Sequence, residues 1–252
     1  MNYISNAFSI LNLDAEDDKE QTAAAADATV DGTDATVSDK GKKKGKGSGK
    51  KRLVKIENND TQSPPSEEFK LPLVWIDLEM TGLDVDEDRI LEIACIITDG
   101  NLTKLVEGPD LVIHQTEECL DKMGEWCRNH HGASGLTKRV LQSTISEQDA
   151  EKQVIDFVRK HVGTYTPLLA GNSVYVDFSF LKRYMPGLAG LFSHVVVDVS
   201  SVKALCIRWY PRENKKAPSK ENKHRAMDDI KESIVELRYY KEQIFKGSKS
   251  GR

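Results

Sequence analysis

An apolar stretch that ends in two acidic residues most constrains what this chain can fold into. Residues 71–78 are almost continuously apolar, which is typical of a buried β-strand, and Asp77 and Glu79 lie at the end of the stretch. Alternate residues of a strand point to the same face, so the two carboxylates would project together and repel each other unless a cation compensates them. Oxygen ligands of this kind select hard ions such as Mg²⁺ or Mn²⁺. The alternative is a strand that ends at Ile76, with both acids in a solvated loop.

Apolar patterns along the rest of the chain predict further strands and helices. Three early strands joined by tight turns indicate an antiparallel meander: the first strand above, residues 89–98, and a third strand over 102–114 that Gly108 and Pro109 can interrupt. Helices at 147–162, 177–184, 201–209 and 227–244 then alternate with short strands at 167–171 and 195–199. This order favours a mixed α/β architecture over a doubly wound parallel sheet.

Charge and composition divide the chain into unlike parts. Residues 1–39 carry nine acidic residues and one lysine, whereas residues 40–55 carry nine basic residues and no acidic one. In residues 21–51 valine is the only large apolar residue, which is too little to offset the entropy lost on ordering. We therefore predict a disordered N-terminal extension over 1–69, a folded domain over 70–246 and a flexible tail over 247–252. The lysine-rich segment 40–55 suits RNA phosphates, a nuclear address or simply a solvated tail.

Several functional classes are disfavoured by the sequence. No stretch approaches the roughly 18–20 apolar residues of a membrane span, which predicts a soluble protein without a membrane partner. The four cysteines lack CxxC spacing and lie among apolar residues, which favours a reducing, intracellular environment over a zinc site or a disulfide framework. The N-terminal pattern fits neither a secretory signal nor an Arg-rich transit peptide, so mitochondrion, cytosol and nucleus all stay open.

Acidic residues also adjoin two later apolar segments. Asp177 opens a predicted helix, and Asp228 and Asp229 precede the C-terminal helix, close to His224. Taken singly, each acid suits a helix N-terminus, where the macrodipole stabilises negative charge. Taken together, three separated acid-bearing segments beside core elements predict one shared site.

Seven blocks of this sequence resemble the DEDDh 3′→5′ exonucleases, and most closely the oligoribonuclease family. The resemblance spans about 70–246 and rests on VWIDLEMTGL, DRILEIACIITDGNL, EGPDLVIHQ, HGASGLT, LLAGNSVYVDFSFLKRYMP, VDVSSVKAL and HRAMDDI. It implies an RNase H-like mixed sheet flanked by helices. Matched residue by residue, it also implies two divalent cations, Mg²⁺ or Mn²⁺, held by Asp77, Glu79, Asp177 and Asp229, with His224 as general base and Asp228 as a neighbour of the ligands.

The resemblance further implies a homodimer that hydrolyses short single-stranded RNA, from dinucleotides to about pentanucleotides, into 5′-mononucleotides. Leu83 would be a wedge between bases, with Trp126 and His131 lining a base pocket. Ser173 would lie near the terminal ribose, and Ser200 and Ser201 near the 5′ phosphate. Trp126 equally suits a core or interface position.

One departure from the family separates this chain from its relatives. Bacterial and animal relatives tend to carry a Tyr-Arg pair just before the D-V-S block, whereas residues 193–197 here contain no arginine. Either His194 supplies a weaker contact, or the 5′ phosphate is held less tightly.

Two other functions compete: a DEDDh exonuclease for longer RNA or DNA, and an RNA-binding adaptor with a nuclease fold. The net negative charge of the folded part argues for small substrates. The presence of all five residues that match catalytic positions of the family argues against an adaptor.

Overall fold

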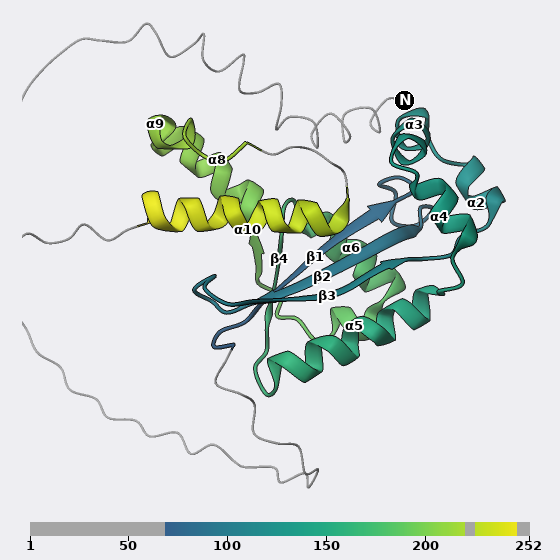
Figure 1. The fold of residues 1–252 in the computed structure, drawn as a ribbon, viewed down its shortest axis with the longest axis horizontal. Helices are drawn as coiled ribbons and strands as arrows, with labels where there is room; N and C mark the ends of the chain where they lie inside the picture. Colours follow the sequence, from purple (N-terminus) through teal and green to yellow (C-terminus); the bar gives the residue numbers. More distant parts are fainter. Residues whose placement is uncertain (1–68, 220–224, 246–252) are drawn as a thin grey trace, which may run out of the picture. The chain divides into compact units, whose positions relative to one another are not determined.

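The computed structural model describes residues 69–219 and 225–245 (Figure 1). The predictions for the N-terminal extension, the lysine-rich segment and the C-terminal tail lie outside these residues, and so does the predicted general base, His224. Within the described ranges, five strands form one mixed sheet in the order β3-β2-β1-β4-β5. No helix in these ranges combines the length and the apolar character needed to cross a membrane.

The central strand of the sheet carries the predicted acid pair. β1 (Leu73–Met80) pairs antiparallel with β2 (Ile90–Thr98) through its whole length, so the alternative in which the strand ends at Ile76 is wrong. β2 in turn pairs antiparallel with β3 (Leu105–Val112). On the other side β1 runs parallel to β4 (Leu168–Gly171), which runs parallel to β5 (Val196–Asp198). The expected antiparallel meander is confirmed, and the two short strands that follow it extend the sheet in parallel.

The expected break at Gly108 and Pro109 is an irregularity within one strand. Ala94 pairs with Asp110 and Ile96 with Glu107. Gly108 and Pro109 therefore both lie opposite the single residue Cys95. A proline has no N–H to donate to a ladder and is accommodated at such bulges. Gly108 faces the Phe157 ring so closely that an added Cβ would lie 2.3 Å from a ring carbon. The strand therefore bends at this point without ending.

Among the described residues, four helices follow the sequence prediction closely, and five were not predicted. Ser146 caps α5 and exchanges hydrogen bonds with Asp149 in a capping box, which explains where that helix begins. The helices expected from sequence are α5 (Glu147–Val162), α6 (Tyr175–Tyr184), α8 (Val199–Trp209) and α10 (Ala226–Gln243), with α7 (Pro186–Ala189) after the predicted stop. The unexpected ones between β3 and α5 are α2 (Glu117–Asp121), α3 (Glu125–Ala133) and α4 (Leu136–Gln142); a short α9 (Pro211–Asn214) follows α8.

Helices cover both faces of the sheet, with α5 on one face and α10 on the other (Figure 1). Val74, Ile76 and Leu78 of β1 belong to the apolar core under α5 and α6. Trp75 belongs to the second core, under α8 and α10. Because side chains alternate along a strand, Asp77 and Glu79 follow Trp75 on the α10 face.

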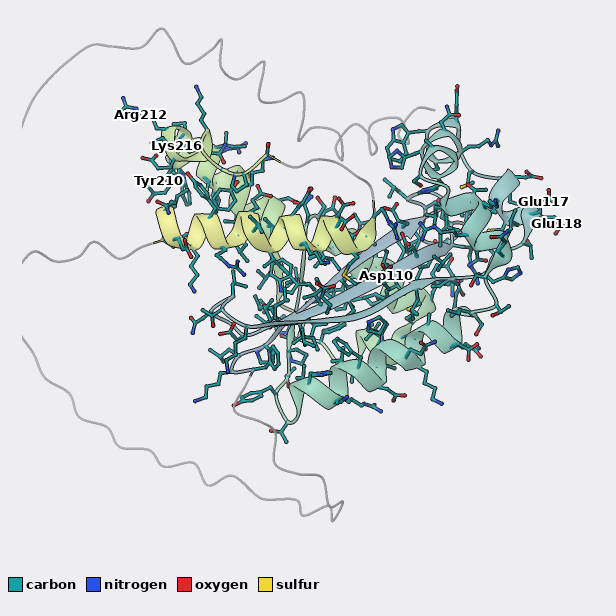
Figure 2. All side chains as sticks on the ribbon, in the orientation of Figure 1. Asp110, Glu117, Glu118, Tyr210, Arg212 and Lys216 are labelled. Atoms are coloured by element: carbon teal, nitrogen blue, oxygen red, sulfur yellow. The ribbon has the colours of Figure 1, made fainter. Side chains whose placement is uncertain are left out.

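Glu117 and Glu118 of α2 lie at one end of the described sheet and helices, and Arg212 and Lys216 around α9 lie at the other (Figure 2).

Candidate active site

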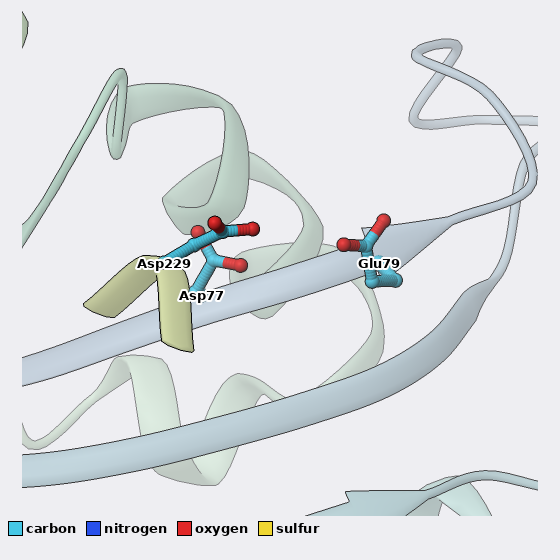
Figure 3. A group of neighbouring side chains, drawn as sticks. All are labelled: Asp77, Glu79 and Asp229. Atoms are coloured by element: carbon cyan, nitrogen blue, oxygen red, sulfur yellow. The ribbon is translucent and has the colours of Figure 1, made fainter. Parts of the chain in front are cut away.

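Three of the predicted acids meet on the α10 face of the sheet. Oxygen atoms of Asp77, Glu79 and Asp229 lie within 4.8 Å of one another, and all three side chains are half-buried (Figure 3). Asp229 comes from the first turn of α10, whose buried Ile230 and Ile234 belong to the same apolar core as Trp75. The packing of α10 on the sheet therefore brings a third carboxylate to the pair on β1.

Asp177 approaches the same strand from α6. Its Oδ1 accepts a hydrogen bond of 3.0 Å from the backbone N–H of Leu78, the residue between Asp77 and Glu79. This N–H is available because β4 pairs with β1 only as far as Trp75. Asp177 is buried and lies outside the group of three carboxylates within 4.8 Å, but its charge acts on Glu79.

Burial and the repulsion of neighbouring negative charges raise the pKa values of Glu79 and Asp177. Burial, with the Asp229 charge second, raises the pKa of Glu79 to about 8. Burial also raises the pKa of Asp177 to about 7, against the opposing effect of the Leu78 hydrogen bond. A set of hard oxygen donors whose negative charges are costly without a cation fits a divalent metal ion. The cluster thus indicates that the protein uses divalent metal.

The two residues predicted for a base pocket come from α3. The Nε2 atom of His131 lies 2.8 Å from the Met80 carbonyl oxygen, and its Nδ1 lies 4.0 Å from a Glu79 carboxylate oxygen. His131 is buried and contacts the end of β1 through these two atoms. Trp126 is 38% exposed and stacks on His130 with ring centroids 4.6 Å apart. α3 therefore places the buried imidazole of His131 beside Glu79, and it carries the exposed Trp126 ring five residues earlier.

Two predicted serines meet where the parallel strands β4 and β5 end. The Ser173 N–H donates to Asp198 Oδ1 at 3.0 Å and to Ser200 Oγ at 2.7 Å, and the two hydroxyl oxygens are 2.9 Å apart. Ser173 holds this position with a φ of 51°, in the left-handed region that costs a non-glycine residue free energy. Ser201 is exposed on the next position of α8. Leu83 is half-buried just beyond β1.

Sequence reasoning missed Asp198, which holds these serines together. The Asp198 carboxylate also accepts a bond from the Ser200 N–H at 2.9 Å and so caps α8. The available signal was an acid near the end of the predicted strand 195–199, just before the predicted helix 201–209.

It also missed an ion pair beside Glu79. Glu92 of β2 is the cross-strand partner of Glu79 and is 1% exposed. Its Oε1 accepts a hydrogen bond of 2.8 Å from Arg139 Nη1 on α4. A lone acid within the apolar run RILEIACIIT was the signal in the sequence.

Comparison with known proteins identifies the family. A family model described as Exonuclease matches residues 74–237. An oligoribonuclease from Arabidopsis thaliana is 59% identical over 246 residues, which are 98% of this chain and 99% of that protein. The chain belongs to the oligoribonuclease family. Within this family, the mitochondrial oligoribonuclease of Homo sapiens is 53% identical over 69% of this chain and 73% of its own length. An oligoribonuclease of Haemophilus influenzae is 49% identical over 70% of this chain and 97% of its own length.

Solved structures of more distant exonucleases share the fold of this oligoribonuclease family member. Exonuclease I from Methylocaldum szegediense superposes with a TM-score of 0.55 at 16% identity, over 69% of this chain and 41% of that chain. E. coli exonuclease I in complex with a dA16 oligonucleotide gives 0.54 at 16% identity, over 69% and 42%. The chain thus spans less than half the length of these solved proteins. The predicted mixed sheet flanked by helices is confirmed as an exonuclease fold.

Proposed function

We propose that this chain is a 3′→5′ exoribonuclease that degrades short single-stranded RNA, from dinucleotides to about pentanucleotides, to 5′-mononucleotides. The observation that carries the proposal is the convergence of Asp77, Glu79 and Asp229 within 4.8 Å, in a member of the oligoribonuclease family. Relatives named oligoribonucleases match nearly the whole chain or its folded part.

The acid cluster is the proposed site for two divalent cations, Mg²⁺ or Mn²⁺. Asp77, Glu79 and Asp229 would hold them, with Asp177 completing the set from α6. Bound cations of this kind lower the pKa of a water molecule and stabilise the oxygen that leaves. The carboxylates orient the cations, and α10 and β1 fix the carboxylates because both elements pack in one apolar core.

The remaining proposed roles belong to residues other than the four acids. His224 takes the proton from the water that attacks the phosphorus, a role suited to a group that titrates near neutral pH. The bond from phosphorus to the 3′ oxygen of the preceding nucleotide breaks, and the terminal nucleotide leaves with its 5′ phosphate. Trp126 stacks on a base without reading its identity, and Leu83 separates the bases. Ser173, Ser200 and Ser201 would contact ribose and phosphate.

A homodimer is proposed from the apolar surface around α8. Trp209 is 65% exposed, Tyr210 is 43% exposed and Leu205 is 41% exposed. Tyr210 lies beside the basic residues at the α9 end (Figure 2). Exposed aromatic residues of this kind are typical of interface cores. Sedimentation equilibrium on wild type and on Trp209→Glu tests the proposal, since a monomeric wild type would contradict it.

Hydrolysis of 5′-phosphorylated RNA from two to ten nucleotides, with Mg²⁺ or Mn²⁺, tests the proposed function. We expect fast cleavage of the shortest substrates, and loss of cleavage in Asp229→Asn. Asp228→Asn is the matched control, since it removes a neighbouring charge from the same helical turn and should stay active. Rates that rise with length would favour an exonuclease for longer nucleic acids. Absence of metal-dependent cleavage would favour an RNA-binding adaptor.

The boundary of the catalytic domain is a separate proposal. We propose that residues 70–246 suffice for dinucleotide hydrolysis, because the acid cluster and, apart from Phe69, the apolar cores lie within these residues. A variant that lacks residues 1–69 should keep its kcat on a dinucleotide within about twofold. A collapse of kcat in this variant would place the extension in the catalytic unit.

A further inference from the structure

A buried ion pair lies beside the acid cluster and takes no part in the chemistry proposed above. Glu92 and Glu79 are directly opposed on β2 and β1, so their side chains leave the same face of the sheet with Cβ atoms roughly 5 Å apart. Arg139 binds Oε1 of Glu92 at 2.8 Å. Glu92 Oε2 is buried and has no hydrogen-bond partner among the residues that the structure describes. A buried carboxylate oxygen without a hydrogen-bond partner in the described part of the chain, next to the proposed metal ligand Glu79, requires an explanation.

The two members of the pair act on Glu79 in opposite directions. The Glu92 charge raises the pKa of Glu79, and the Arg139 charge lowers it. A buried carboxylate next to another is unfavourable, and a guanidinium next to a metal ligand, here that of the partly exposed Arg139, competes with the metal. The Arg139 charge offsets the repulsion from Glu92, and the Glu92 charge offsets the competition from Arg139, only while both residues are present.

We propose that Glu92 and Arg139 are positioning residues that keep each other out of the metal site. The inference rests on the proposed function, since it requires cations at Asp77, Glu79 and Asp229. Without Arg139, the Glu92 carboxylate is released beside the cluster and becomes an extra hard ligand in the wrong place. Without Glu92, the guanidinium of Arg139 turns to Glu79 and competes with the cation for that carboxylate.

A purely structural ion pair is the competing explanation, because Arg139 also ties α4 to the sheet. The chain offers a matched control for that role. Arg89, just before β2, binds Glu147 of α5 at 2.7 Å, and its guanidinium likewise links a helix to the sheet. Neither residue is among the charges that mainly shift the pKa of Glu79. Arg89→Gln therefore reports what loss of an anchoring pair does by itself.

The test compares Glu92→Gln, Arg139→Gln and the double variant with Arg89→Gln. Mn²⁺ binding to the metal-free full-length protein is measured by electron paramagnetic resonance, and kcat and KM are measured on a dinucleotide. We expect Mn²⁺ affinity to fall roughly tenfold in Glu92→Gln, because a cation is left beside Glu79. We expect Arg139→Gln to bind Mn²⁺ at least as tightly as wild type, with kcat roughly tenfold lower and KM nearly unchanged. The double variant should lie closer to wild type than Glu92→Gln in Mn²⁺ affinity, and closer to wild type than Arg139→Gln in kcat.

Two results would overturn the inference. One is that both single variants match Arg89→Gln in Mn²⁺ affinity and kcat, and lose only thermal stability. The other is that the double variant shows the sum of the two single effects, since mutual shielding requires rescue. If Arg139→Gln does not fold, Arg139→Lys replaces it, because it keeps the charge and should retain wild-type Mn²⁺ affinity. The comparison of Glu92→Gln with the double variant then still shows whether loss of Arg139 restores Mn²⁺ affinity. A wild type that binds no Mn²⁺ and cleaves nothing would instead refute the proposed function.

Discussion

The Asp177 carboxylate accepts a hydrogen bond from the Leu78 N–H, and this single 3.0 Å contact joins α6 to β1 between two acids of the site. Asp177 therefore has two separable roles. As an acceptor it satisfies a buried backbone donor beyond the end of the β1–β4 ladder. As a charge it belongs to the proposed metal site.

Substitutions at Asp177 should separate these two roles. Asp177→Asn keeps an oxygen acceptor for Leu78 but loses the charge, whereas Asp177→Ala loses both. We expect kcat to fall at least about a hundredfold in both variants. In metal-free protein, Asp177→Ala should be about 1–3 kcal/mol less stable than Asp177→Asn, because the Leu78 donor is left unsatisfied. Urea unfolding measures the difference, and equal stability of the two variants would contradict the structural role.

The metal-free protein should lose stability as the pH rises from about 4 to about 8. The pKa values of Glu79, about 8, and Asp177, about 7, are raised above those of the unfolded chain. Between the unfolded and folded pKa values the native state binds more protons, so the free energy of unfolding falls as these protons leave. The lowered pKa values of Asp99 and Asp149 affect stability only at pH values below this window.

Urea unfolding from pH 5 to pH 9 in a chelator checks this expectation. The decline should be smaller in Asp177→Asn, which lacks one of the two groups. Saturating Mn²⁺ should abolish the decline in wild type, because cation binding favours the ionised carboxylates. A wild-type curve parallel to that of Asp177→Asn would show that Asp177 keeps an ordinary pKa.

Removal of the exposed ring on α3 should weaken substrate binding more than chemistry. In Trp126→Ala we expect KM for a dinucleotide to rise roughly tenfold with kcat little changed, as is typical for loss of one base-stacking surface. Tyr165→Ala is the control, since Tyr165 is similarly exposed but lies after α5. A fall in kcat at constant KM would instead assign Trp126 to alignment of the reacting atoms.

The strained backbone at Ser173 gives a test that uses two substitutions of one hydroxyl. Both Ser173→Gly and Ser173→Ala remove Oγ, but only glycine adopts a φ of 51° without strain. We expect the glycine variant to be more stable than the alanine variant by about 1 kcal/mol. Thermal unfolding measures this difference. Both variants should show the same increase in KM, and unequal KM values would mean that backbone geometry controls binding.

Elements with strong local signals were predicted from the sequence alone. α5 combines a capping box at Ser146 with apolar residues on one face, and β1 combines an apolar run with acids two residues apart. α2, α3 and α4 were not predicted, since helices of five to nine residues depend on packing more than on local periodicity.

Relationships between distant segments were harder to predict than the segments themselves. The family resemblance named Asp77, Glu79 and Asp229, and the structure brings them together. The partnership of Glu92 with Arg139 depends on the register of β2 against β1 and on the position of α4, neither of which is encoded locally. The contact of Asp198 with Ser173 likewise depends on how β4 and β5 align.

The order of the acids along the chain has a consequence for biosynthesis. Asp77 and Glu79 emerge early, whereas Asp229 belongs to α10, the last helix that the structure describes, and reaches β1 only when α10 packs beside Trp75. A polypeptide still being translated, or truncated before α10, lacks the third carboxylate. The complete acid cluster can therefore form only after α10 has been synthesised and has packed on the sheet, which makes the site a late product of folding.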